Sequence, residues 1–219
     1  MRPIFVAFLV LGMMLPAGCN RAAVPAPGPT IVYVVRHAEK APDPKDPPLS
    51  PAGVVRAEAL ARVLEGAEIA AIYSSQTQRT ESTVRPLSQK IGIPISYGTA
   101  AMDDPAAYAR QLAAEVLAKH RGQNVVIVNH SNTVPVIVET LSGQAVAPMS
   151  DYEYATLFIV TIPPDGPPSV VRAQYGQQDG VAPTAPQAAA LREVRPFAAN
   201  PVASPAVRPG EEKRRDRVL

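Results

Sequence analysis

Four side chains able to do phosphate chemistry stand at or just beyond the ends of predicted strands. Arg36 and His37 directly follow a β-branched run, Arg79 lies in the turn after a second apolar run, and His130 closes a later one. Because ligands of an open parallel sheet bind beyond the carboxyl ends of its strands, we expect these side chains to converge at one edge. Glu39 is the one carboxylate that accompanies them at those strand ends.

A cluster of this kind would repel itself unless it held an anion. Guanidinium groups bind phosphate in a planar, two-pronged manner, and a helix predicted after His130 would add backbone N–H donors. Neutral imidazole is a competent nucleophile, so a phosphohistidine intermediate could split one difficult displacement into two easier ones. Arginines and a second histidine would stabilise the charge on the phosphoryl oxygens. The four residues therefore indicate an oxyanion site, with phosphate as the expected anion.

Other chemistries fit the same segments less well. Ser131 follows a strand as a serine nucleophile would, but Asn129 and Thr133 stand where the G-x-S-x-G motif has glycines. A metal site would need histidines without neighbouring arginines, and the two common glycine-rich nucleotide motifs are absent from the sequence. His120 closes a helix, where a cation favours the helix dipole, and we assign it no function. We expect neither a metal nor a cofactor.

Strands alternate with helices along most of the chain. This order predicts a three-layer α/β/α domain with a mainly parallel sheet. The run 30–35 is continuously β-branched, as expected for a strand buried on both faces. The predicted strands are 30–35, 69–73, 95–97, 125–128, 156–162 and 169–175, and the predicted helices begin near residues 50, 76, 104 and 133.

Two helices carry more specific expectations. Ser50 and Pro51 suit the N-cap and first position of a helix whose apolar face we expect to hold Val55, Ala59, Leu60 and Val63, among others, with Arg56, Arg62 and Glu65 pointing elsewhere. Pro86 lies inside the next helix and should kink or split it.

The N-terminus resembles a targeting segment. A short positive start precedes an apolar run that is too short to span a bilayer and ends in Leu-Pro-Ala-Gly-Cys19, which resembles a bacterial lipoprotein signal. We expect Cys19 to be lipidated and the chain to be exported and membrane-anchored, in the periplasm or on the outer surface. The expected organisation is a signal peptide at 1–19, an Ala/Pro linker at 20–29, a domain at 30–176 and a disordered tail at 177–219.

Composition excludes some partners. The formal net charge is only +2 and is spread evenly, which argues against a nucleic-acid-binding protein. Cys19 is the only cysteine, so the chain cannot form an internal disulfide. The expected partners are a small phosphorylated substrate or a phosphoprotein, and the membrane through the lipid.

Four stretches carry a family resemblance. VVRHAEK resembles the R-H-G/A signature of the histidine phosphatase superfamily, which has the phosphoglycerate mutase-like fold. The likeness continues in order through LSPAGVVRAEALARVL, IYSSQTQRTESTVRPLS and VVIVNHSNTVPVIVETL, over roughly residues 30–175. It implies that His37 is the phosphorylated nucleophile and that Arg36, Arg79 and His130 form the phosphate pocket. The short chain is more similar to the compact phosphatases and phosphohistidine phosphatases than to the sugar-phosphate mutases.

The proton donor for the leaving group departs from the family patterns. Many relatives use a Glu between the third strand and the next helix, and others an Asp directly after the second histidine, where Ser131 stands. Between the third predicted strand and the next helix, the available carboxylates are Asp103 and Asp104. Asp104 directly precedes Pro105, as a helix N-cap would, and its carboxylate would then be bound to backbone N–H groups. We therefore take Asp103 as the candidate acid. Ser131 is a candidate phosphate ligand. The alternative is a phosphate-ester-binding lipoprotein without turnover.

Overall fold

A six-stranded mixed sheet forms the centre of the domain. The computed structural model describes residues 27–42, 45–97 and 104–180. Across the sheet the strand order is β3-β2-β4-β1-β5-β6; β1 to β4 pair in parallel, while β5 runs antiparallel to β1 and β6 antiparallel to β5. The strands are β1 (Thr30–Arg36), β2 (Ile69–Ser74), β3 (Ile95–Tyr97), β4 (Asn124–Asn129), β5 (Thr156–Ile162) and β6 (Ser169–Gln174).

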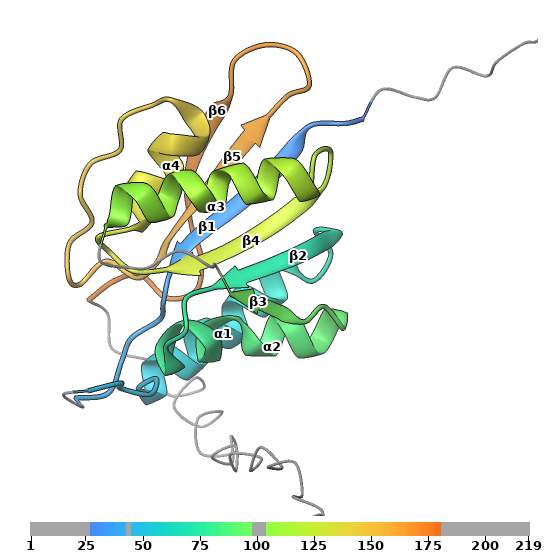
Figure 1. The fold of residues 1–219 in the computed structure, drawn as a ribbon. Helices are drawn as coiled ribbons and strands as arrows, with labels where there is room; N and C mark the ends of the chain where they lie inside the picture. Colours follow the sequence, from blue (N-terminus) through green and yellow to red (C-terminus); the bar gives the residue numbers. More distant parts are fainter. Residues whose placement is uncertain (1–26, 43–44, 98–103, 181–219) are drawn as a thin grey trace, which may run out of the picture.

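Helices cover both faces of this sheet. In Figure 1, α1 and α2 lie together on one side and α3 and α4 on the other. The predicted three-layer α/β/α class with a mainly parallel sheet is therefore confirmed. The helices are α1 (Pro51–Leu64), α2 (Gln78–Ile91), α3 (Pro105–Lys119) and α4 (Val134–Ser142).

Strand alternation divides the apolar residues between two cores. Along β4, Val125 and Ile127 face the core beneath α3 and α4, whereas Val126 and Val128 face the core beneath α1 and α2. All four side chains are fully buried. Since successive side chains of a strand point to opposite faces, a β-branched run is what a sheet covered on both sides requires.

Capping residues define the helix starts as the sequence predicted. Ser50 accepts a hydrogen bond from the Gly53 N–H at 3.2 Å, and Pro51 fills the first turn of α1. Asp104 accepts from the N–H groups of Ala106 and Ala107, both at 3.0 Å, at the start of α3. These contacts satisfy first-turn donors that a helix leaves without partners.

One helix expectation was wrong, and of the two effects expected of Pro86 the split is excluded. Arg56 does not point away from the core of α1 but is buried, while Val63, expected inside, is 53% exposed. Partners from other segments hold Arg56 inside, which a periodicity of apolar residues cannot reveal. Pro86 does not split α2, which runs unbroken past it. Val84 and Leu87 on either side of the proline are fully buried, and their packing offsets the backbone hydrogen bond that a proline removes.

Residues just after the predicted boundary at residue 176 contact the domain. Gln177 accepts a hydrogen bond from Arg56 through its carbonyl, and Asp179 accepts from the backbone of Tyr154 and Ala155. The predicted signal peptide, most of the linker, Cys19 and the rest of the tail lie outside the described residues. Within the described ranges no helix is long and apolar enough to cross a membrane.

Candidate functional site

His37 lies at the carboxyl end of β1, in the middle of the sheet. Its backbone N–H donates to the Asn129 carbonyl at the end of β4, 2.8 Å away, and its side chain is buried. Nδ1 of the ring lies 2.8 Å from the carbonyl oxygen of Ala38. Because a carbonyl can only accept, Nδ1 carries the proton, and the lone pair of the neutral ring is therefore on Nε2.

The surroundings favour the neutral form of His37. The pKa of His37 is lowered to about 3, chiefly by burial and also by the charges of Arg36, His130 and Arg79, against the opposing hydrogen bond to Ala38. At neutral pH the imidazole is therefore unprotonated on Nε2, which is the form that can attack an electrophile.

His130 stands opposite His37 at the end of β4. The two ring centroids are 5.5 Å apart in an edge-on arrangement. Nδ1 of His130 lies 3.3 Å from Nη2 of Arg79, and Nε2 lies 2.9 Å from the Ser75 hydroxyl. A guanidinium can only donate, so Nδ1 is the acceptor and Nε2–H donates to Ser75. The pKa of His130 is lowered to about 4, chiefly by burial and also by the charges of Arg79 and Arg36, while Asp46 opposes the shift.

Arg36 is held through its Nη1, whereas its Nε makes no hydrogen bond with the described residues. Its Nη1 donates to three main-chain carbonyls of the loop before β5, those of Ser150, Asp151 and Glu153, at 2.9, 3.0 and 3.3 Å. The Tyr154 ring stacks on the guanidinium, 4.3 Å from Cζ to the centroid. Nε of Arg36 is buried and has no hydrogen-bond partner among the described residues. A buried donor without a partner suits a site that receives an oxyanion.

Arg79 begins the second helix and faces a carboxylate. Its Nη1 lies 3.4 Å from Asp46 Oδ1, whose oxygens also accept from the Gln78 N–H at 3.1 and 3.2 Å. Asp46 thus caps α2 from a distant loop, in the place of Thr77, whose side chain makes no capping bond. The carboxylate offsets part of the positive charge that the two arginines bring to the site.

The structure brings the four predicted residues Arg36, His37, Arg79 and His130 together. Ser131 follows in the next turn and is half-buried. The predicted helix donors are less available than expected, because the N–H groups of Thr133 and Val134 donate back to the His130 carbonyl. Asp103, the candidate acid, and Cys19 lie outside the described residues.

Several residues around the site escaped the sequence prediction. Asp46 sits in a proline-rich loop with no motif to mark it, and Tyr154 reaches Arg36 from the far end of the domain. Thr83 accepts from the Ala38 N–H at 2.8 Å, and Ser75 contacts His130. The sequence shows that these residues are polar, but no local pattern predicts which distant residues they contact.

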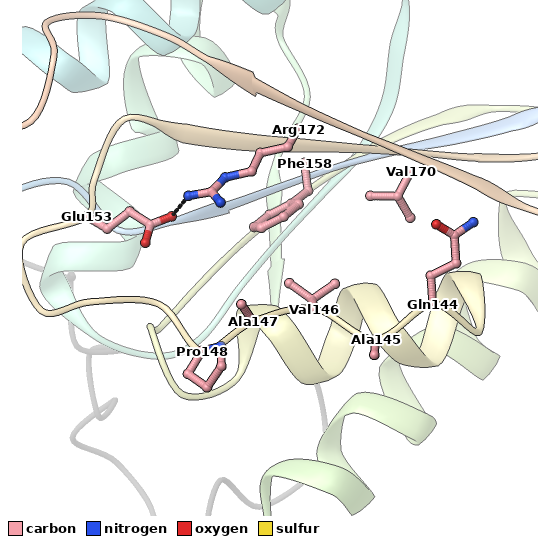
Figure 2. A pocket seen from close by; sticks show the side chains of 9 residues that line it. All are labelled: Gln144, Ala145, Val146, Ala147, Pro148, Glu153, Phe158, Val170 and Arg172. Carbon is pink, nitrogen blue, oxygen red and sulfur yellow. Dashed lines mark hydrogen bonds and ion pairs between the residues drawn. The ribbon is translucent and has the colours of Figure 1, made fainter.

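A separate cavity of about 250 Å³ lies between the loop after α4 and the β5–β6 hairpin. Figure 2 shows its apolar side chains facing one another, with the Glu153–Arg172 ion pair at one end. None of the predicted site residues lines it, so the cavity is distinct from the cationic cluster. The lining residues are Gln144, Ala145, Val146, Ala147, Pro148, Glu153, Phe158, Val170 and Arg172.

Comparison with known proteins gives one family match over part of the chain. Residues 32–103 match the family model of the histidine phosphatase superfamily (branch 1). No curated protein matches the chain. Among the described residues there is no group of three or more histidines, cysteines and acids that could hold a metal ion.

Solved structures share the fold at low sequence identity. The protein histidine phosphatase SixA complexed with tungstate is 21% identical, with a TM-score of 0.53 over 66% of this chain and 96% of that one. A mycobacterial glucosyl-3-phosphoglycerate phosphatase is 18% identical, with a TM-score of 0.50 over 60% and 89%. Mycobacterial hydrolase 2 is 16% identical, with a TM-score of 0.56 over 75% and 96%. The family model thus matches part of the chain, and the fold is shared with solved structures that include phosphatases.

Proposed function

We propose that this protein is a phosphatase that hydrolyses a phosphomonoester, a phosphohistidine or an acyl phosphate through a phosphohistidine intermediate on His37. One observation carries the proposal. The Nδ1–H of His37 is fixed on the Ala38 carbonyl, so that the free lone pair is on Nε2, in a buried site that also holds Arg36, Arg79 and His130.

The proposed reaction has two displacements. Nε2 of His37 attacks phosphorus as the bond from phosphorus to the leaving atom breaks. The leaving atom is an oxygen in a phosphomonoester or an acyl phosphate and a nitrogen in a phosphohistidine, and the oxygen of a phosphomonoester takes up a proton. Water then attacks the phosphohistidine, the nitrogen–phosphorus bond breaks and its electron pair returns to Nε2, the water gives up a proton to the phosphate or to solvent, and inorganic phosphate leaves. Arg36 and Arg79 supply fixed positive charge to the phosphoryl oxygens in both steps, so the proposal requires no metal ion.

His130 would change its bonding when phosphate binds. Its Nδ1 accepts from Arg79 in this structure. A phosphate dianion in the site would offset the arginine charges that depress its pKa, and a protonated Nδ1 would then donate to a phosphoryl oxygen. Ser131 remains a candidate phosphate ligand from the following turn.

The leaving-group acid is proposed to be Asp103. Two other carboxylates are committed elsewhere, since Asp104 caps α3 and Glu39 accepts a two-pronged pair of hydrogen bonds from Arg56. A substrate with a better leaving group, such as a phosphohistidine or an acyl phosphate, would need little protonation.

An acid-quench experiment tests the proposal. The protein is mixed with a ³²P-labelled phosphate ester, quenched during turnover and digested. We expect a label on His37 that is lost in acid and kept in base, and no label and no turnover in His37→Ala. His120→Ala, which changes the histidine of a helix end, is the control and should label normally. Turnover in His37→Ala would overturn the mechanism, and phosphate binding without any adduct would favour the non-catalytic binding protein.

For the cellular location, we propose export and membrane anchoring through a lipid on Cys19. The apolar run and small residues before this cysteine support the proposal. In cells given labelled fatty acid, the full chain should take up label and Cys19→Ser should not. Soluble, cleaved protein from Cys19→Ser would instead indicate an ordinary signal peptide.

A further inference from the structure

Arg56 in α1 is a buried cation outside the catalytic cluster. Its side chain is 3% exposed. Nε lies 3.0 Å from both carboxylate oxygens of Glu39, and Nη2 lies 2.7 Å from Oε1. A buried guanidinium is costly unless its donors are paired, so this geometry ties α1 to the segment that follows β1.

The Nη1 and Nη2 groups of Arg56 also bind the chain that follows β6. Nη1 donates to the carbonyls of Tyr175 and Gln177 at 3.1 and 2.9 Å, and Nη2 lies 3.4 Å from Asp179 Oδ1. The same Asp179 oxygen accepts from the backbone N–H groups of Tyr154 and Ala155, at 2.9 and 3.0 Å. The guanidinium therefore connects the chain after β6 with the loop before α1, and through Asp179 with the loop before β5.

The first of these loops orients His37. Ala38 lies between His37 and Glu39; its N–H donates to Thr83 and its carbonyl accepts the Nδ1–H of His37. The Glu39 carbonyl accepts from the Ser50 N–H at 2.8 Å, and a Cβ at Gly53 would collide with that oxygen. Arg56 holds the Glu39 side chain at the same point. The carbonyl that fixes the His37 tautomer is thus set by contacts on both sides of it.

The second loop orients Arg36. The Glu153 carbonyl accepts from Arg36 Nη1, and the next residue, Tyr154, stacks its ring on the guanidinium. Asp179 holds the Tyr154 N–H, so the position of this ring depends on the chain after β6. Arg56 contacts the first loop through Glu39, and its partner Asp179 contacts the second loop through the Tyr154 and Ala155 N–H groups.

We propose that Glu39, Arg56 and Asp179 are positioning residues for His37 and Arg36. They lie beyond the reacting atoms and act through the Ala38 carbonyl and the Glu153–Tyr154 main chain. The segment Tyr175–Asp179, at the end of the domain, is therefore part of the catalytic apparatus. This inference rests on the proposed function for its effect on rate, but not for its effect on the His37 tautomer.

The test uses ¹⁵N-histidine spectra of the full chain at pH 7. The chain has only three histidines, which makes the ring signals simple to assign with His120→Gln and His130→Gln variants. The unchanged protein should show His37 in the single Nδ1–H tautomer. Glu39→Gln keeps the shape but removes the charge, and should give a mixture of tautomers and a fall in kcat of about ten- to a hundred-fold, as misplaced catalytic groups cause.

Asp179→Asn tests the other arm of the network. The amide keeps an oxygen for the Tyr154 N–H but loses the charge that faces Arg56, so kcat should fall while the His37 tautomer changes less than in Glu39→Gln. Weaker competitive inhibition by vanadate should accompany it, because Arg36 is held through Tyr154.

Leu64→Ala is the matched stability control. Leu64 is buried at the other end of α1, so its truncation lowers the melting temperature without touching either loop. The inference is overturned if Glu39→Gln lowers the melting temperature as Leu64→Ala does but leaves the tautomer and kcat unchanged. A tautomer mixture in Glu39→Gln, with no hydrolysis by any form of the protein, would support the positioning and reject the proposed function.

Discussion

Nη2 of Arg79 lies 3.3 Å from Nδ1 of His130, so that one catalytic candidate donates directly to another. The arginine comes from the start of α2 and the histidine from the end of β4. The contact fixes the His130 ring with Nε2–H on Ser75, and the charge of Arg79 also lowers the pKa of His37. It also makes Arg79 the arginine whose removal changes both the charge and the histidine orientation of the site.

Arg79→Ala should therefore lower kcat by about 10²–10³-fold, by analogy with the loss of one oxyanion donor. Vanadate and inorganic phosphate should inhibit the unchanged protein competitively and the variant more weakly. Steady-state kinetics with an aryl phosphate measure both effects. Arg62→Ala, an exposed arginine of α1, is the control and should retain normal kinetics. Unchanged kinetics of Arg79→Ala would remove this arginine from the phosphate pocket.

The central cluster was predictable because it follows from strand order alone. Arg36 and His37 end β1, and His130 follows β4, its parallel neighbour in the sheet. A buried, β-branched strand that ends in polar residues places them at the carboxyl edge without any knowledge of the loops. The sequence therefore predicted which side chains meet, along with the layers that carry them.

What stayed hidden was the set of distant partners. Arg56 looked exposed because apolar periodicity assigns a charged residue to solvent, whereas Glu39 and Asp179 reach it from remote parts of the chain. The same holds for the loop carbonyls that bind Arg36, more than a hundred residues away. Periodicity reports which face a residue occupies, and it carries no information on long-range polar pairing.

The two histidines should make stability depend on pH. The pKa values of His37 and His130 fall from 6.5 to about 3 and about 4 in the folded protein, chiefly through burial. Between pH 6.5 and these values the unfolded chain binds more protons than the folded one, so unfolding becomes easier as the pH falls. Each histidine contributes a slope of up to about 1.4 kcal/mol per pH unit.

Urea unfolding between pH 5 and 6.5 measures this slope, above the range where most carboxylates titrate. His130→Asn should show a shallower decline in the free energy of unfolding than the unchanged protein. Added vanadate should also reduce the decline, because an anion offsets the charges of Arg36 and Arg79. A free energy of unfolding that does not change over this pH range would contradict buried, neutral histidines.

Asp46 should tune the affinity for phosphate. Its carboxylate lies 3.4 Å from Arg79 Nη1 and also caps α2 at Gln78. Asp46→Asn removes the charge but keeps an oxygen for the cap, so phosphate should bind more tightly. The pair is partly exposed and worth about 1 kcal/mol or less, which corresponds to a factor of about five or less in the inhibition constant.

Asp46→Ala separates the charge from the cap. It should show the same gain in phosphate affinity as Asp46→Asn but a lower melting temperature, because the Gln78 N–H loses its acceptor. Inhibition constants and melting temperatures of the two variants give the comparison. Weaker phosphate binding in both would mean that Asp46 orients Arg79 for the anion rather than competing with it.

Substitution of Asp103 and of Asp104 should affect the hydrolysis rates of good and poor leaving groups differently. Asp104 Oδ1 accepts from the Ala106 and Ala107 N–H groups, and a carboxylate held in this way is a poor proton donor. Asp103→Asn should therefore slow hydrolysis of an alkyl phosphate far more than that of an aryl phosphate, since only the poorer leaving group depends on protonation. Steady-state rates on the two esters give the ratio.

Asp104→Asn is the matched control, since it makes the same chemical change at the adjacent position. It should slow both esters about equally and mildly, and lower stability through a cap weakened by roughly 1 kcal/mol or less. If Asp103→Asn also affects both esters equally, Asp103 takes no part in protonation. Glu39 is a poor replacement because Arg56 occupies both of its oxygens. The reaction would then have to be one whose leaving group departs unprotonated, which favours an acyl phosphate or a phosphohistidine as the substrate class.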